Sequence, residues 1–91
     1  MKSETKQTTC LKMQRFADVT KEAILHGNLE RARHCLIIAE EIFKNGGVDI
    51  KNTVSNVYVF SVSVFMEINH YKIESLFPPV LNAVYIEQIN A

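Results

Sequence analysis

The chain carries no excess of charge of either sign. It has 10 lysine and arginine residues against 10 aspartate and glutamate residues. Nucleic-acid backbones and anionic membrane surfaces attract an excess of positive charge, so we expect neither as a partner. Residues 1–33 are mildly basic, but carboxylates are interspersed among their basic side chains, and no base-stacking aromatic residues lie between them. These basic residues include Lys12, Arg15, Lys21, Arg31 and Arg33.

The sequence also lacks a hydrophobic leader and an apolar run of membrane-spanning length. The opening MKSETKQTTC mixes both charge signs, whereas a secretory signal has an apolar stretch. The longest segment without a charged residue, 52–66, is fifteen residues long and includes two Asn and three Ser. It is too short and too polar to cross a bilayer. We therefore expect a cytoplasmic protein, in which Cys10 and Cys35 are free thiols.

Motifs for catalysis, cofactors or metals are missing as well. The sequence has no Cys-x-x-Cys and no pair of histidines at helical ligand spacing. His34 and Cys35 are adjacent, so they point about 100° apart on a helix. Gly46 and Gly47 lack the lysine of a phosphate-binding loop. We predict no catalytic residue, no cofactor and no metal. One alternative stays open, a small enzyme or ligand-binding protein with an apolar pocket or a Cys–His pair that meets in space.

Helical periodicity is the main positive feature. A chain of 91 residues with 47% hydrophobic composition suits one domain. We expect a flexible tail over residues 1–8 and a single helical domain over 9–91. Apolar and small residues recur at helical spacing from Met13 to Ile24. Gly27 and Asn28 then predict a helix stop followed by a new N-cap, and a second helix runs to the Asn-Gly-Gly sequence at 45–47.

The segment 52–68 is rich in β-branched and aromatic residues, which favour strands. Alternation with a period of two places polar residues on both faces of such a strand. Helical periodicity sorts them better, because it gathers the polar residues in one narrow sector. The segment is also longer than a typical strand of about 5–6 residues. We therefore predict a buried central helix, with a bent pair of strands as the alternative. The polar sector contains Asn52, Asn56, Ser63 and Glu67.

The last segment contains tandem prolines in LFPPVLNAVYIEQI. Proline disfavours helix in the preceding residue and fits the first turn of a new helix. A final helix is therefore expected from about Pro79, after a short turn near residues 71–76. Together these segments predict an all-α fold, a compact bundle of about four helices.

Two resemblances accompany this pattern. In residues 13–46, the spacing of large, small and turn residues resembles the tetratricopeptide repeat, which implies that the first two helices form a hairpin of that type. The residues concerned are Phe16, Val19, Thr20, Ala23, Gly27, Ala32, Leu36 and Ala39. The carboxy-terminal half resembles small bacterial helical proteins of unknown function, and this likeness implies no active site.

One surface of the central helix suggests a function. Phe60 falls within the narrow polar sector, and Val59 and Met66 lie at its edge. Apolar residues at such positions need a cover, so Val59, Phe60 and Met66 form a candidate interface. Our leading hypothesis is a helical protein-interaction module that self-associates and has no catalytic activity. Its partner is expected to be another copy of the chain or another protein.

Overall fold

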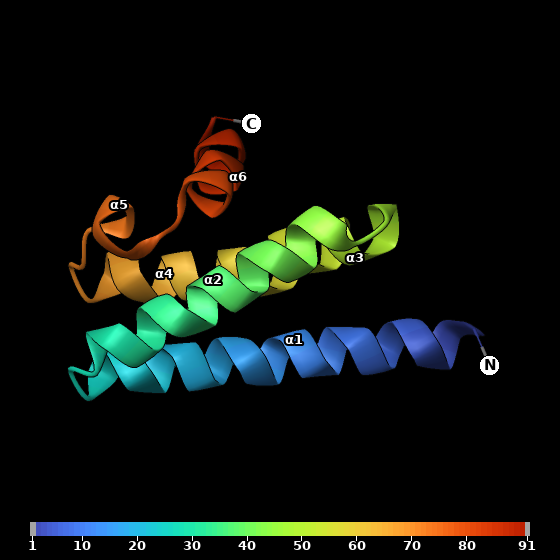
Figure 1. Ribbon diagram of the computed structural model, residues 1–91, viewed down its shortest axis with the longest axis horizontal. Coiled ribbons are helices and arrows are strands. Elements are labelled where there is room, and N and C mark those ends of the chain that lie inside the picture. The colour runs from blue at the N-terminus through green and yellow to red at the C-terminus, as the bar shows by residue number, and fades with distance from the viewer. Residues whose placement is uncertain (1, 91) are drawn as a thin grey trace.

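The computed structural model describes the backbone of residues 2–90 and the side chains of residues 9–90. Every regular element in these residues is helical, which confirms the all-α prediction (Figure 1). Three long helical stretches lie side by side, and a shorter carboxy-terminal part rests on one side of them. The elements are α1 (Lys2–Leu25), α2 (Leu29–Asn45), α3 (Val48–Thr53), η1 (Val54–Val59), α4 (Phe60–Ile68), α5 (Ile73–Leu76) and α6 (Pro79–Ile89).

The helices α1 and α2 form a hairpin with a tight turn. Gly27 has a φ of +76°, a conformation that glycine adopts without steric strain. Its N–H donates to the carbonyl of Ile24, and the N–H of Asn28 donates to the carbonyl of Ala23 at 2.8 Å. These two bonds close the end of α1 as a Schellman motif. The Asn28 side chain then accepts a hydrogen bond from the N–H of Arg31 and caps α2, as the sequence predicts.

The amino-terminal helix is longer than its apolar pattern. It begins at Lys2, well before Met13, where apolar residues first recur. Residue 1 lies outside the described part of the chain. The predicted division into a tail over 1–8 and a domain over 9–91 concerns independent motion in solution, so it stays a prediction.

The segment 48–68 is one continuous helical stretch, which confirms the helix and excludes the pair of strands. Its middle part, η1, is a π-helix, in which the N–H of Phe60 bonds back five residues to the carbonyl of Ser55. Such a turn holds one residue more than an α-helical turn. The residues after it are therefore rotated by about 100° relative to an uninterrupted α-helix.

This rotation decides which residues of the central helix enter the core. At the start of η1 the core side carries Val54, and from the end of η1 onward it carries Val59, Val62 and Met66, all with 0% exposure. An uninterrupted α-helix would place Val54 and Met66 about 120° apart. The extra residue of the π-turn brings them back onto one face. Ser63, which the sequence pattern assigned to the polar sector, is buried for the same reason.

The carboxy-terminal part begins with a second Schellman motif. His70 has a φ of +65°, and the N–H of Tyr71 bonds to the carbonyl of Met66 at 2.8 Å. The short helix α5 and Phe77 are anchored in the core by buried side chains. The final helix starts at Pro79, as expected from the tandem prolines. In this helix Leu81 is fully buried, and Ile89 is exposed.

The core lies where α1, α2 and the central helix meet. Tyr58 is its largest fully buried side chain, and its ring stacks on Phe16 with 5.4 Å between centroids. The Tyr58 hydroxyl lies 2.7 Å from the Thr20 hydroxyl, which itself donates to the carbonyl of Phe16. Because the Thr20 proton is used in that bond, Tyr58 is the donor to Thr20. Burial raises the pKa of the Tyr58 phenol, since the charged form loses its hydration.

Candidate functional site

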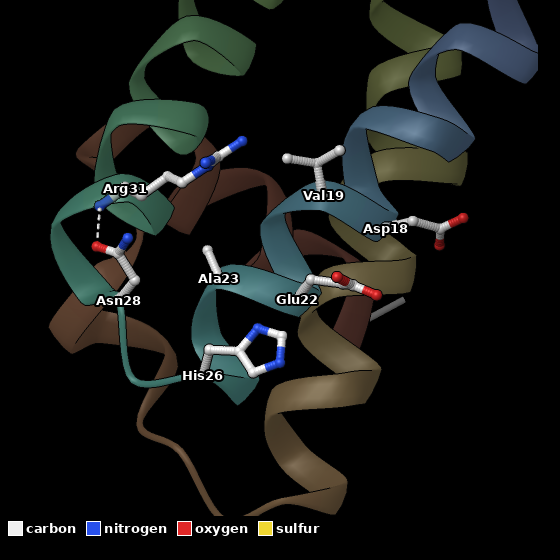
Figure 2. A pocket seen from close by; sticks show the side chains of 7 residues that line it. All are labelled: Asp18, Val19, Glu22, Ala23, His26, Asn28 and Arg31. Atoms are coloured by element: carbon white, nitrogen blue, oxygen red, sulfur yellow. Dashed lines mark hydrogen bonds between the residues drawn. The ribbon is translucent and has the colours of Figure 1, made fainter.

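A groove lies between the end of α1 and the start of α2 (Figure 2). It has a volume of about 380 Å³ and is open to solvent. We call it the hairpin groove, and it is lined by Asp18, Val19, Glu22, Ala23, His26, Asn28 and Arg31. The turn at Gly27 and Asn28 creates it, because that turn folds α2 back beside the last turns of α1.

Two side chains of opposite charge flank the hairpin groove. In Figure 2, the Arg31 side chain extends from α2 toward Val19 on α1, and Glu22 projects from α1 beside His26. Within the described part of the chain, neither Glu22 nor Arg31 forms a salt bridge. Asp18 differs, because its carboxylate lies 3.2 Å from the Lys21 ammonium. The groove therefore presents one free carboxylate and one free guanidinium.

Apolar side chains continue the hairpin groove along α2. Val19, on the floor between the two helices, is 40% exposed. Ile38 and Ile42 follow Arg31 at helical spacing, so they lie on the same side of α2, and they are 38% and 37% exposed. An exposed apolar strip with a polar rim is typical of protein–protein interaction sites.

A second hollow adjoins the first around the start of α2. Its volume is about 520 Å³, and it shares Asn28 and Arg31 with the hairpin groove. Arg33, His34 and Ile37 complete much of its lining. Both hollows are open rather than enclosed. Pockets for small molecules usually surround about 70–90% of their ligand, so these open hollows differ from such pockets.

The predicted interface residues do not share one exposed face. Phe60 is exposed, with 58% of its surface accessible. Val59 and Met66 have 0% exposure and belong to the core, so placing them at the edge of an exposed sector was wrong. The π-helical turn in η1 is the reason. Its extra residue rotates the end of η1 and the helix after it by about 100°. A contact between chains at Phe60 stays a prediction.

The cysteines and histidines are dispersed over the structure. Cys10 is exposed and Cys35 is buried, and both are free thiols. His34 is exposed although Cys35 is buried, as expected for neighbours on a helix. The hairpin groove contains His26 but neither cysteine. Among the described residues, no group of three or more His, Cys, Asp or Glu side chains could hold a metal ion.

One buried carboxylate was missed by the sequence pattern. Glu40 is followed by a second glutamate, and the sequence pattern places both on the polar face of α2. In the structure, Glu40 is buried and accepts a hydrogen bond of 2.8 Å from the N–H of Val80. It therefore caps α6 from a neighbouring helix. The cap residue Pro78 offers no side-chain acceptor, which is the only signal in the sequence that an outside cap is needed.

The hairpin groove was missed for a different reason. Its floor residue Val19 and its charged rim look like an ordinary mixed surface when each helix is read alone. The two rims come together only through the turn at Gly27. A search for opposite charges on both sides of that predicted turn could have found Glu22 and Arg31.

The fold and the groove define a small all-α protein with an open surface site. The family model that matches the chain is described as Domain of unknown function (DUF7674), and it covers residues 2–91. The chain therefore belongs to this family. No curated protein and no solved structure matches it. The likeness of residues 13–46 to a tetratricopeptide repeat is supported only as far as a helical hairpin, and the likeness of the carboxy-terminal half only as far as an all-α protein of unknown function.

Within residues 2–90, none of the helices combines the length and the apolar character that a bilayer span needs.

Proposed function

We propose that this protein is a small helical interaction module without catalytic activity, and that it pairs with a second copy of itself through the hairpin groove. The observation that carries this proposal is the position of Glu22 and Arg31, two unpaired side chains of opposite charge that flank one apolar strip.

A surface with both charges can complement itself. In a two-fold symmetric pair, the contact between two residues occurs twice, once in each direction. Glu22 of one copy can then face Arg31 of the other, and the reverse contact follows from the symmetry. Val19, Ile38 and Ile42 would supply the apolar centre between these two ion pairs.

The overall charge favours the same partner. With 10 basic and 10 acidic side chains, two copies have no net repulsion to overcome. A net charge near zero also promotes association of a protein with itself. The alternative of a small enzyme or ligand-binding protein receives less support, because the hairpin groove is open and neither cysteine lines it.

Sedimentation equilibrium of the full chain tests the proposal. We expect the wild type to self-associate and Ile38→Glu to be a monomer, because the new carboxylate would be buried without a partner in the contact. Ile86→Glu is the matched control, since Ile86 on α6 is similarly exposed, at 45%, but is not part of the groove. A monomeric wild type would contradict the proposal, as would equal loss of association in both variants.

Phe60 offers a second candidate contact, because its large ring is mostly exposed. Phe60→Asp belongs in the same experiment. We expect this variant to stay folded, since Phe60 is outside the core. Dissociation of Phe60→Asp, with Ile38→Glu still associated, would place the contact at Phe60 instead of the hairpin groove.

A further inference from the structure

The last helix has a small apolar contact with the core and several polar contacts. Leu81 is the only residue of α6 that is buried, Val84 and Tyr85 pack against the core while partly buried, and the Tyr85 ring meets that of Phe77 edge-on with 6.3 Å between centroids. Ile86 and Ile89 are exposed. Three side-chain hydrogen bonds add to this packing: Glu40 with the N–H of Val80 at 2.8 Å, Gln88 with the carbonyl of Ser55 at 2.7 Å, and Tyr85 with the carboxylate of Glu67. The Tyr85 contact is exposed to solvent. Hydrogen bonds of this kind each contribute little net stability.

The segment before α6 is anchored separately. Ile73, Leu76 and Phe77 are all buried in the core, so α5 is fixed by its own side chains. Pro78 and Pro79 follow at once, and α6 begins at the second of them. Proline has no N–H to bond to the rest of the protein. At these two residues no backbone N–H bonds the start of α6 to the anchored segment before it.

From these contacts we infer that α6 is a lid that opens as a unit, pivoting at Pro78 and Pro79, while α1, α2 and the central helix stay folded. In the closed state α6 packs on η1 and α2, and it lies on the outside of the layer formed by the long helices (Figure 1). Opening uncovers η1 and releases the Glu40 carboxylate. Access to the π-turn is thereby controlled by α6, independently of the hairpin groove.

Hydrogen exchange of the full-length wild type tests this inference without any substitution. When a segment opens locally, the opening exposes little surface. The exchange rate of its amides therefore depends little on low concentrations of urea. We expect this behaviour for the amides of residues 80–89. The amides of residues 17–24, 32–39 and 62–66 should instead show strong dependence on urea. An equal dependence in α6 and in these core segments would overturn the inference.

Two pairs of variants extend the test to the contacts themselves. Gln88→Ala removes one contact and should speed exchange in α6 by roughly twofold to tenfold, the effect of one hydrogen bond on the opening equilibrium. Glu40→Ala should act in the same direction. The controls, Glu87→Ala on α6 and Glu41→Ala on α2, change adjacent exposed residues whose side chains take no part in the three contacts that hold α6. Faster exchange confined to α6 supports the lid, and an unchanged α6 or a uniform increase in all helices contradicts it.

Discussion

At the scale of single residues, the buried hydroxyl pair of Tyr58 and Thr20 ties α1 to the central helix. Helical spacing predicts that both side chains face inward, but it cannot show that their hydroxyls meet. Replacing Tyr58 by Phe should lower the free energy of unfolding at neutral pH by about 0.5–1.5 kcal/mol, the net contribution of one hydrogen bond. Urea denaturation monitored by circular dichroism measures this change.

The same variant predicts a difference at alkaline pH. Burial raises the pKa of Tyr58 above its ordinary value of 10.0, so the folded protein favours the neutral phenol. The contribution of that group to stability is complete below pH 10 and is lost as the pH rises further. The wild type should therefore lose more stability above pH 10 than Tyr58→Phe, by up to roughly 1.4 kcal/mol per pH unit. An equal loss of stability with pH in the two proteins would contradict this prediction, because Tyr58 would then ionise in the folded protein as readily as in the unfolded chain.

Gly27 and His70 both have a positive φ, and substitutions at these two positions should change stability in opposite directions. Gly27→Ala places a side chain in the left-handed region and should destabilise the protein by roughly 1–2 kcal/mol. His70 already bears a side chain in that region, so His70→Gly should stabilise the protein by roughly 1 kcal/mol. Thermal melting checks both signs. A lower melting temperature for His70→Gly would contradict this prediction. It would show that contacts of the His70 side chain stabilise the protein by more than the backbone strain destabilises it.

At the scale of elements, the sequence predicts the helices well and their internal irregularities poorly. The turn at Gly27 and the start of α6 at Pro79 depend on local backbone chemistry, so they are visible in the residues themselves. The π-turn in η1 depends on how the central helix packs on α1 and α2. In the sequence, the π-helical turn corresponds to a one-residue shift in the spacing of the buried residues, which falls between Tyr58 and Val59. Without that shift, Val59 and Met66 were assigned to the wrong face.

The π-turn also predicts the effect of a deletion. Removing Asn56, an exposed residue of η1, should convert the π-turn to an α-turn and keep both ends of the helix in place. We expect a folded protein with an unchanged helical spectrum. Deleting the exposed Asp18 from α1 is the control. It would rotate Met13 and Ala17 out of the core by about 100°, with a loss comparable to the total stability of about 5–15 kcal/mol. Similar melting of the two deletion variants would contradict the role assigned to η1.

At the scale of the whole molecule, the protein combines one core with many exposed large apolar side chains. Large apolar side chains are exposed on α1, α2, α4 and α6, including Leu11, Val19, Ile37, Ile38, Ile42, Phe60, Ile86 and Ile89. The sequence indicated such a surface on the central helix, and of the three residues assigned to it only Phe60 is exposed. The hairpin groove needs the folded arrangement of two helices, so single-helix periodicity could not predict it.

Charge exchange across the hairpin groove tests the central claim most directly. Glu22→Arg and Arg31→Glu should each abolish self-association, because each places like charges in both copies of the symmetric contact. The double variant Glu22→Arg with Arg31→Glu should restore the dimer, and so should mixing the two single variants. Sedimentation equilibrium should then give about twice the chain mass of 10.4 kDa for the wild type and the double variant, and the chain mass for each single variant. Single variants that still dimerise, or a double variant that stays monomeric, would contradict pairing through Glu22 and Arg31.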